Sequence, residues 1–562
     1  MFPSAGSPAR AAAPAYRADV LTPTVRLPVP HTPLLQRLLE ASALARAPAR
    51  RNVPVEQIIE EREDARLSRR RLIALAAAGA GLAACERGER LVGLAPRAAR
   101  TPDSRARVVI VGAGLAGLTC AYRLKQAGIA ATVYEASGRV GGRCFTRYGH
   151  FADGQIAERG GELIDQSHTE TRQLAQELGL DLDNLLRAEA SGTEPFYFFD
   201  GSRYAYADAT RDLKAAWQTL HRDLSDASYP TLYTSFTPRG FQLDHMSIAE
   251  WIDASIPGGR ASRLGQLLET AYVIEYGAEA AEQSALNLIY LLGYSGQGQL
   301  RIFGPSNEKY RVRGGNDQVA ARLAAALSGQ IVTGAPLVAI ARTSAGGYAL
   351  TFGGGRTVTA DKVVLTIPFS VLRSSVDYGR AGFNAIKQTA IRELGMGANA
   401  KLTVQFTSRH WSAIGGNGET YADAGYQATW DASRAQAGAA GLLVDYTGGR
   451  TTLALAGVTA AEATRRFLGQ IEPVFPGLSA RWNGRSTLDY WPGDPWTKGS
   501  YSFWKVGQYT RFAGAEGERS GNCHFAGEHT SIDSQGYLNG AVESGERAAR
   551  EVAADLGLRA SA

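Results

Sequence analysis

The chain has few cysteines: four among 562 residues, with no pair in the CxxC spacing of a zinc site. The low number excludes a disulfide-stapled scaffold, and the spacing excludes a zinc ribbon. Apolar runs are short, and none reaches the ~20 residues that a membrane-spanning helix needs. The 64 glycines follow no G-X-Y period, which excludes collagen. With 44% hydrophobic residues, the chain is an ordinary globular protein with room for about three domains, or two with one interrupted.

Lysine is absent from the N-terminal part of the chain, where arginine supplies an excess of positive charge. Residues 1–107 contain 18 Arg and 10 Asp or Glu, whereas the rest contains 42 Lys or Arg and 44 Asp or Glu. The net charge of +6 therefore comes from the N-terminal leader, and the body is close to neutral. This distribution argues against a nucleic-acid partner, which would need a basic face on the folded body.

Residues 66–85 resemble an export signal. The pair Arg69-Arg70 precedes a 13-residue apolar run, 72–84, which is too short to span a bilayer but suits the centre of a signal peptide. The arginine pair resembles a twin-arginine signal, so we expect an exported protein, periplasmic or extracellular. Leu82-Ala83-Ala84-Cys85 resembles a lipobox, which makes Cys85 a candidate lipid anchor. The alternative is ordinary cleavage beside an incidental cysteine.

Two segments flank this signal. Residues 1–65 are rich in Ala, Pro and Arg and show little periodicity, so we expect an extension without stable structure. Either a retained pro-segment or a mis-assigned start would place 65 residues before a signal. Residues 86–106 are expected to form a linker to the folded body.

A dinucleotide fingerprint opens the folded body. A β-branched run at 108–111 predicts a buried strand, and a helix is predicted over 118–127. A second strand, 131–134, ends at Glu135, whose carboxylate can accept hydrogen bonds from a ribose. The glycines between strand and helix let backbone N–H groups approach a pyrophosphate. The predicted nucleotide contacts are Gly112, Gly114, Leu115, Ala116, Gly117 and Glu135.

The segment after Glu135 resembles the extended motif of flavin amine oxidases. It reads Ala136-Ser137-Gly138-Arg139-Val140-Gly141-Gly142-Arg143. In that family the two glycines and the arginine lie against the FAD pyrophosphate, and the fork of an arginine matches phosphate oxygens. Near the C-terminus, the segments 525–530 and 535–545 resemble the second FAD motif of monoamine oxidases, polyamine oxidases and L-amino acid oxidases.

The resemblance covers about residues 107–556, because Asn316-Asp317-Gln318 and the strand at 363–368 also match. It implies an α/β fold: a Rossmann-like, GR2-type FAD-binding domain interrupted by an α+β substrate-binding domain. The FAD-binding domain would comprise 107–165, 310–375 and 485–562, and the substrate-binding domain 166–309 and 376–484. The further FAD contacts that it implies are Ala136, Arg139, Gly141, Gly142, Arg143, Gly160, Gly161, Glu162, Val338, Thr366, Trp496, Gly527, Glu528, Gly536, Tyr537 and Leu538.

The same resemblance implies three catalytic residues and no metal. A family lysine in the strand that contains Lys401 holds a water next to flavin N5. Tyr501 and Tyr537 match the two rings that flank the substrate amine in monoamine oxidases. The alternatives are a lysine that reaches solvent at a strand end and two core tyrosines. Ser500 stands where monoamine oxidases have a flavin-linked cysteine, so we expect non-covalent FAD.

These features predict an enzyme that oxidises an amine with O2 to an imine and then an aldehyde, releasing ammonia and hydrogen peroxide. Many L-amino acid oxidases have an arginine for the substrate carboxylate where this chain has Glu162, so we expect a primary amine or polyamine.

Several alternatives stay open at this stage. An L-amino acid oxidase would take Arg301, Arg311 or Arg313 as the partner of the substrate carboxylate. A tryptophan 2-monooxygenase-type outcome uses the same scaffold. A non-catalytic exported flavoprotein is the alternative of another class, although such a protein would not need Lys401 and the tyrosine pair. A homodimer also stays open.

Overall fold

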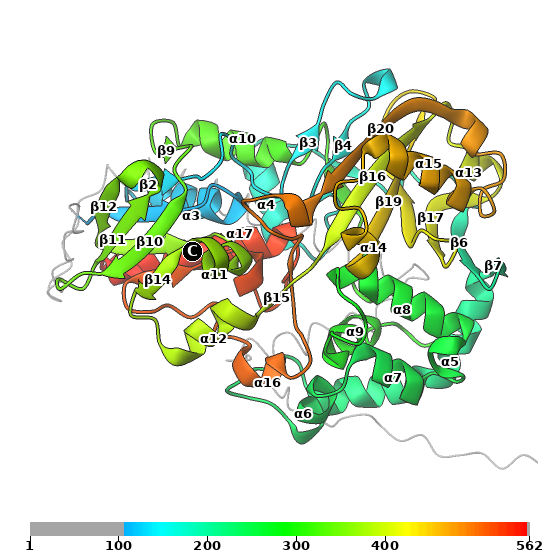
Figure 1. The fold of residues 1–562 in the computed structure, drawn as a ribbon, viewed down its shortest axis with the longest axis horizontal. Helices are drawn as coiled ribbons and strands as arrows, with labels where there is room; N and C mark the ends of the chain where they lie inside the picture. Colours follow the sequence, from blue (N-terminus) through cyan, green and yellow to red (C-terminus); the bar gives the residue numbers. More distant parts are fainter. Residues whose placement is uncertain (1–105, 559–562) are drawn as a thin grey trace, which may run out of the picture. The chain divides into compact units, whose positions relative to one another are not determined.

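The computed structural model describes residues 106–558 (Figure 1). The predicted export signal, the candidate anchor Cys85 and the N-terminal extension lie outside the described residues, so they stay predictions. Among the described residues, no helix combines the length and the apolar character that crossing a membrane requires.

A parallel sheet of five strands carries the glycine-rich loop. Its strands lie in the order β22-β13-β1-β2-β9, and every neighbouring pair is parallel. Val108 and Ile110 enter one hydrophobic core, whereas Val109 and Val111 enter another, so β1 is buried on both faces. This explains its continuous β-branched run. The strands are β1 (Val108–Val111), β2 (Ala131–Tyr134), β9 (Ile331–Val332), β13 (Lys362–Leu365) and β22 (Cys523–Phe525).

Helices cover one face of this sheet, and a smaller sheet covers the other (Figure 1). On the first face, α3 packs against both α10 and α17. On the second, four strands in the order β12-β11-β10-β14 share a core with β1, α11 and α12. The elements are α3 (Leu115–Gln126), α10 (Asp317–Ala326), β10 (Leu337–Arg342), β11 (Tyr348–Phe352), β12 (Thr357–Ala360), α11 (Phe369–Ser375), β14 (Asp377–Arg380), α12 (Ala385–Glu393) and α17 (Leu538–Asp555).

Helix α3 begins at Leu115, three residues before the predicted start. The third glycine of the fingerprint, Gly117, is therefore inside the first turn of the helix. A Cβ there would lie 2.0 Å from the carbonyl oxygen of Gly112, so only glycine allows the helix to begin this close to the strand. The C-terminal helix begins at Leu538.

A second sheet of seven strands lies in the part of the chain predicted to bind substrate. Its order is β20-β16-β19-β18-β17-β6-β7, with one parallel pair, β17 and β6. Helices α5, α7, α8 and α9 share one core with β6 and β17, and α15 packs on β16 in another. The elements are β6 (Glu194–Phe199), β7 (Ser202–Tyr204), α5 (Tyr206–Ala227), α7 (Ile248–Ser255), α8 (Arg263–Tyr276), α9 (Ala285–Leu292), β16 (Asn399–Phe406), β17 (Gly416–Ala422), β18 (Ala428–Asp431), β19 (Gly441–Gly448), α15 (Ala460–Ile471) and β20 (Trp482–Tyr490).

Shorter elements connect the two sheets. β3 pairs with β4, β5 with β8, and β15 with β21, all antiparallel. The elements are β3 (Thr146–Arg147), β4 (Ala157–Glu158), α4 (Thr169–Glu177), β5 (Leu182–Asn184), α6 (Pro238–Asp244), β8 (Tyr310–Val312), β15 (Gly395–Met396), α13 (His410–Ala413), α14 (Gly449–Leu453), β21 (Ser502–Phe503) and α16 (Gln508–Phe512), with the 3-10 helices η1 (Ala152–Gly154), η2 (Gly259–Ala261), η3 (Gly353–Gly355), η4 (Ser479–Arg481), η5 (Trp491–Gly493) and η6 (Glu528–Thr530).

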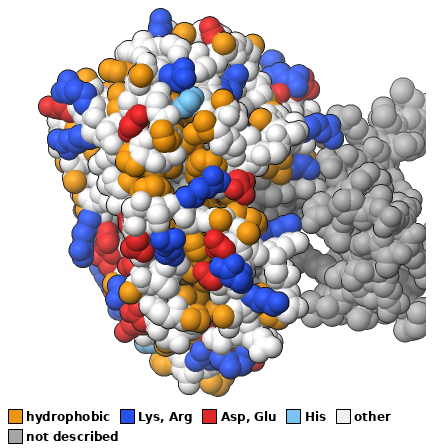
Figure 2. All heavy atoms as spheres, turned by 90° about the vertical axis from the view of Figure 1, so that its right-hand side faces the viewer, with side chains coloured by type: hydrophobic (Ala, Val, Ile, Leu, Met, Phe, Trp, Pro, Cys, Tyr) orange, Lys and Arg blue, Asp and Glu red, His pale blue; other side chains and the backbone are white. Residues whose placement is uncertain are grey.

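Charged side chains of both signs are mixed on the face that Figure 2 presents. Lysine and arginine lie next to aspartate and glutamate, and hydrophobic side chains are scattered between them. A nucleic-acid footprint requires a broad basic patch, which this face does not supply.

Candidate active site

The fingerprint loop forms a cradle at the N-terminus of α3. Gly112 has φ +106, and a Cβ there would lie 2.5 Å from Oγ1 of Thr366. A Cβ at Gly114, in contrast, would meet none of the described atoms within 4 Å. The backbone at Gly114 is therefore open to a ligand, whereas the backbone at Gly112 and Gly117 is packed against the protein. This arrangement fits a pyrophosphate held by backbone N–H groups and the helix dipole.

Glu135 lies immediately after β2 and closes this cradle. Its carboxylate accepts hydrogen bonds from the backbone N–H of Ala113 at 2.7 Å and of Ser137 at 2.9 Å. One oxygen thus fixes the fingerprint loop, and the other fixes the start of the next motif. Its predicted contact with a ribose stays a prediction.

The motif after Glu135 lies directly beside the fingerprint loop. The N–H of Gly141 donates to the carbonyl of Ala113 at 2.8 Å, and Gly141 forms an isolated bridge with Gly114. A Cβ at Gly142 would lie 3.4 Å from Cα of Gly114. Arg139 donates to the carbonyl of Gly142 at 2.8 Å, and its guanidinium lies over the ring of Phe145. The two motifs therefore form one surface of backbone, as the resemblance implies.

Glu528 links the motif that contains Arg143 to the C-terminal motif. It lies in η6, and its carboxylate accepts from Arg143 Nη1 at 2.9 Å, from Ser502 Oγ at 2.7 Å and from the N–H of Gly536 at 2.9 Å. Burial alone would raise the pKa of Glu528, but the Arg143 charge and these donors hold it below its usual value. The structure thus brings Arg143 together with Glu528, 385 positions later in the chain, and with the nearby Gly536.

The other predicted cofactor contacts form two groups: an inner group near the glycine-rich loops and an outer group of more accessible residues. A Cβ at Gly160 would lie 1.9 Å from the Arg143 carbonyl, and one at Gly161 would lie 2.6 Å from the side chain of Leu538. These glycines therefore belong to the same tightly packed region. Of the others, Leu115 and Ala116 are buried at the start of α3, Thr366 Oγ1 donates to the carbonyl of Gly112 at 3.1 Å, and Gly527 and Tyr537 directly precede η6 and α17. In the outer group, Ala136 lies in the loop after Glu135, and Val338 and Trp496 are 41% and 39% exposed.

Lys401 does not reach solvent, so the alternative of a solvent-facing lysine is wrong. It lies on β16 and is 5% exposed. Its ammonium donates to the carbonyl of Gly160 at 2.8 Å, to the carbonyl of Glu158 at 3.3 Å and to Glu162 Oε2 at 2.9 Å. The lysine is thus held against the glycine pair that touches Arg143 and Leu538. Its predicted place beside the flavin ring stays a prediction.

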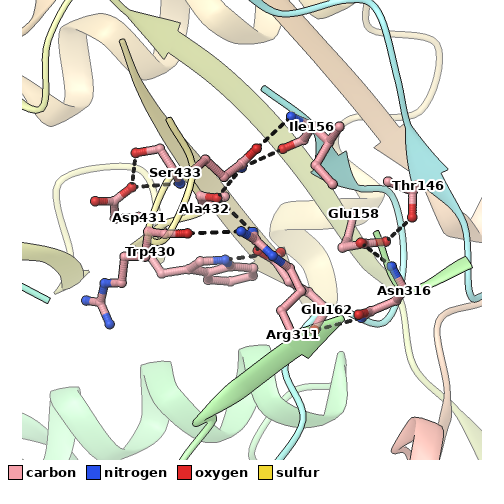
Figure 3. A network of polar contacts seen from close by, with 12 residues as sticks. Thr146, Ile156, Glu158, Glu162, Arg311, Asn316, Trp430, Asp431, Ala432 and Ser433 are labelled. Carbon is pink, nitrogen blue, oxygen red and sulfur yellow. Dashed lines mark hydrogen bonds and ion pairs between the residues drawn. The ribbon is translucent and has the colours of Figure 1, made fainter. Parts of the chain in front are cut away.

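Glu162 requires a correction. We expected its carboxylate to act on the charge of the substrate, but it is buried and its oxygens face Lys401 and, as Figure 3 shows, Trp430 and Arg311. Trp430 Nε1 donates to Oε2 at 3.2 Å, and Arg311 Nη1 lies 3.7 Å from Oε1. Its negative charge is therefore matched within the protein.

Two of the three arginines considered for a substrate carboxylate are engaged elsewhere. Arg311 is buried and donates to the carbonyls of Ala432 at 2.8 Å and Arg434 at 2.9 Å, in addition to its contact with Glu162. Arg313 lies at the surface and pairs with Asp181 and Asp183. The third, Arg301, is exposed.

Tyr501 and Tyr537 both lie next to Gly536, Tyr501 in space and Tyr537 in the chain. A Cβ on Gly536 would lie 3.5 Å from the Tyr501 ring. The Tyr501 hydroxyl meets Tyr446 OH at 2.9 Å, and Tyr537 donates to Glu275 Oε1 at 2.9 Å. Both hydroxyls are satisfied, as in core tyrosines, but both side chains keep partly accessible surface. The pair can therefore present its rings to a ligand while other residues fix the hydroxyls.

The structure adds acidic residues that the sequence reasoning missed. Glu275 lies on α8, and burial raises its pKa to about 7. Glu308 has φ +50, and its backbone N–H donates to Asp165 at 2.7 Å. The negative charges of Asp165, Glu419 and Glu275 around Glu308 act to raise its pKa. These four carboxyl groups lie close enough to interact. Glu275 could have been found as a charged residue in the apolar stretch 271–276.

Ser500 gives a first prediction, which concerns how the cofactor is held. Its hydroxyl is buried and donates to Asn399 at 2.6 Å, and it cannot form the thioether of a covalent relative. We expect the purified protein to be yellow and denaturation to release its flavin. Absorbance of the supernatant and of the precipitated chain measures this directly. Flavin that stays with the polypeptide would contradict it and would direct attention to Cys120, Cys144 or Cys523, which are buried and free.

Comparisons with known proteins agree with this geometry. The chain is 25% identical over 486 residues to the L-amino acid dehydrogenase of Synechocystis sp., covering 81% of this chain and 97% of that protein. It is 27% identical over 453 residues to the nicotine dehydrogenase of Pseudomonas putida, covering 79% and 88%. Among solved structures, cyclohexylamine oxidase from Brevibacterium oxydans is similar with a TM-score of 0.71 at 22% identity, covering 80% of this chain and 99% of that one.

The structural likeness confirms the predicted fold class, an α/β fold with a Rossmann-like FAD-binding domain and a substrate-binding domain. The sequence profile described as flavin containing amine oxidoreductase matches residues 115–553, most of the chain. The glycine cradle, Glu135 and the Arg143–Glu528 pair fit the FAD that such a protein carries. The chain therefore belongs to the flavin-containing amine oxidoreductase family: it is an FAD-dependent oxidoreductase that acts on amines or amino acids.

Proposed function

We propose that the protein is an oxidase of cationic amines, with a primary amine or a polyamine as substrate. The observation that carries this proposal is the group of carboxyl residues Asp165, Glu275, Glu308 and Glu419, of which Glu275 accepts a hydrogen bond from Tyr537. Such a group attracts an ammonium and repels a carboxylate. The engagement of Arg311 and Arg313 elsewhere adds support, because an amino-acid substrate needs a cation for its carboxylate.

In the proposed reaction the amine must bind as a cation and react as a neutral base. Glu275, held by Tyr537, can accept the ammonium proton at its carboxylate, since the pKa of this group is raised to about 7. Tyr501 and Tyr537 orient the amine. Trp430 lies edge-on to Tyr446 at a ring distance of 5.1 Å and extends this group of aromatic side chains. A bound FAD would supply the acceptor for the hydride that leaves the carbon beside the nitrogen, and oxygen would then receive the two electrons as hydrogen peroxide. The imine then hydrolyses to an aldehyde and ammonia.

A second candidate, oxidation of an L-amino acid, is favoured by the L-amino acid dehydrogenase among the relatives.

The names of two relatives also bear on the electron acceptor, because both are dehydrogenases. Purified protein should therefore be supplied with monoamines, diamines and L-amino acids, with oxygen or a dye as acceptor. We expect amines with oxygen to give hydrogen peroxide and aldehyde. Turnover of amino acids alone would favour the second candidate, and turnover with dye alone would overturn the oxidase. No flavin reduction by any compound would leave a non-catalytic flavoprotein.

The acidic group gives a prediction on pH. Glu275 is mostly neutral below its pKa of about 7 and ionised above it, so attraction for an ammonium increases as pH rises through 7. We expect kcat/KM for a diamine to increase over this interval. In Glu275→Gln the increase should disappear, and kcat/KM at pH 8 should fall at least ~10-fold, about 1.4 kcal/mol.

The matched control is Glu269→Gln on the same helix, where the carboxylate pairs with Arg260 at the surface. It should leave the pH profile unchanged. If Glu275→Gln keeps the wild-type pH profile, another group causes the increase in kcat/KM, and Glu275 has no part in the proposed reaction.

A further inference from the structure

We propose that Glu162 is a positioning residue, which fixes the Lys401 ammonium through a buried clamp completed by Arg311 and Trp430. This inference rests on the proposed function, an oxidase, and adds that Lys401 acts in the reaction of its reduced form with oxygen. Glu162 itself touches neither substrate nor reacting atoms in this proposal and acts only through the lysine.

Two hydrogen-bond donors, Lys401 and Trp430, and the Arg311 guanidinium surround the Glu162 carboxylate; Figure 3 shows Trp430 and Arg311. Oε2 receives Lys401 Nζ at 2.9 Å and Trp430 Nε1 at 3.2 Å, and Arg311 Nη1 lies 3.7 Å from Oε1. The side chains of Glu162 and Arg311 are each 3% exposed, and that of Lys401 is 6% exposed. A buried carboxylate with two cations and an indole N–H around it is held in a single orientation.

The Lys401 ammonium is constrained on all sides by this arrangement. An ammonium has three N–H donors, and three acceptors surround it here: Glu162 Oε2 and the carbonyls of Gly160 and Glu158. Glu162 is the charged member of the three. Removing its charge leaves two carbonyl dipoles, which cannot balance a buried cation as well. The position of Lys401 therefore depends on Glu162 more than on the other two.

The clamp joins four segments of the chain. Glu162 follows β4, Arg311 lies on β8, Lys401 on β16 and Trp430 on β18. Arg311 also holds the chain after β18, through the carbonyls of Ala432 and Arg434. Trp430 in turn contacts Tyr446, whose hydroxyl meets Tyr501. The Glu162 carboxylate therefore fixes Lys401 directly and is linked through Trp430 to Tyr446 and Tyr501.

A purely structural ion pair would behave differently from a positioning residue. Loss of a structural pair destabilises the protein and disturbs both half-reactions alike. Loss of a positioning residue disturbs only the step that uses Lys401, and has no further effect once Lys401 itself is removed. The experiment compares these two outcomes in the holoenzyme.

We would measure anaerobic reduction by substrate and reoxidation by oxygen in Glu162→Gln, Glu162→Asp, Lys401→Met and the double variant Glu162→Gln/Lys401→Met. Glu162→Gln should slow reoxidation at least ~10-fold and reduction less than ~3-fold, and Glu162→Asp should restore much of the loss. The double variant should match Lys401→Met. Equal losses in both half-reactions, no rescue by aspartate, or a further loss in the double variant would overturn the proposal.

Glu158→Gln is the matched control. It lies four positions earlier, and its carboxyl group is directed to Thr146 and the N–H of Asn316 rather than to Lys401 (Figure 3). We expect it to change stability without changing the ratio of the two half-reactions. If Glu162→Gln does not fold, Trp430→Phe removes one donor of the clamp without a change of charge. It should slow reoxidation alone by ~3-fold, and an unchanged ratio would count against the clamp.

A readout independent of turnover completes the test. Acetic anhydride should acetylate Lys401 at least ~10-fold faster in Glu162→Gln than in wild type, in both apoprotein and holoenzyme, with the exposed Lys214 as internal standard in peptide mass spectrometry. Equal labelling would overturn the clamp. If wild type neither oxidises amines nor reacts with oxygen, the proposed function fails, but the labelling comparison still decides whether Glu162 fixes Lys401.

Discussion

Gly114→Val is expected to give a folded protein that has lost FAD. A Cβ at this position meets none of the described atoms within 4 Å, so the first carbon of a side chain fits without displacing the protein. The same space lies at the N-terminus of α3, where we expect the FAD pyrophosphate to meet the backbone. A valine there would hold the phosphates away from the N–H groups. We expect FAD affinity to fall at least ~100-fold, about 2.8 kcal/mol, with little change in the melting temperature of the apoprotein.

Gly469→Val is the matched control, because Gly469 is exposed on α15 and a Cβ there also meets nothing within 4 Å. It should keep a full complement of FAD. Flavin content by absorbance and affinity by titration of apoprotein measure both variants. Normal FAD binding in a folded Gly114→Val protein would show that the fingerprint loop does not carry the pyrophosphate.

Lys401→Met should have the second large effect, on the reaction of the reduced enzyme with oxygen. Methionine keeps most of the stem but removes the ammonium that is fixed against Gly160 and Glu162. Oxygen gains negative charge as it is reduced, and a fixed cation in a dry site stabilises that charge. The transfer of hydride from a neutral amine does not need the Lys401 cation. We expect reoxidation to slow at least ~10-fold, about 1.4 kcal/mol of barrier, with a smaller change in anaerobic reduction.

Stopped-flow traces of the two half-reactions separate these rates. Lys387→Met is the control, because Lys387 is also buried but donates to the carbonyl of Glu516 on another part of the fold. It should affect stability and leave the oxygen reaction unchanged. Unaltered reoxidation in Lys401→Met would make Lys401 a structural lysine. An equal fall in both half-reactions would assign it to positioning of the flavin or the substrate.

The elements of the FAD-binding sheet could be predicted from the sequence because their signals are local. The β-branched run at 108–111 and the glycines after it are contiguous in the chain, and each has one structural solution. The start of α3 was misjudged by three residues, since Gly117 was taken as part of the loop. Its actual role, close packing of helix on strand, depends on the Gly112 carbonyl, which only the folded chain brings near.

The pairing of charged residues could not be predicted in the same way. Glu162 and Lys401 were both singled out, but they are 239 positions apart, and nothing local shows that they meet. The sequence therefore assigned Glu162 to the substrate. The same limit applied to Arg311, which was a candidate for a substrate carboxylate until its backbone partners were known. Residue type and motif identify which groups matter, whereas long-range packing decides which group each one faces.

The order of the strands has a consequence for biosynthesis. The cofactor sheet begins with β1 near residue 108 and is completed by β22 and α17, which emerge from the ribosome last. At ~5–20 residues per second, the roughly 400 residues between β1 and β22 take about 20–80 s to synthesise. Throughout that time Arg143 lacks Glu528, and the fingerprint loop lacks the helix whose Gly545 packs on the carbonyl of Ala116. Cofactor capture must therefore follow translation, and a chain truncated before residue 523 cannot assemble the flavin site, however complete its fingerprint.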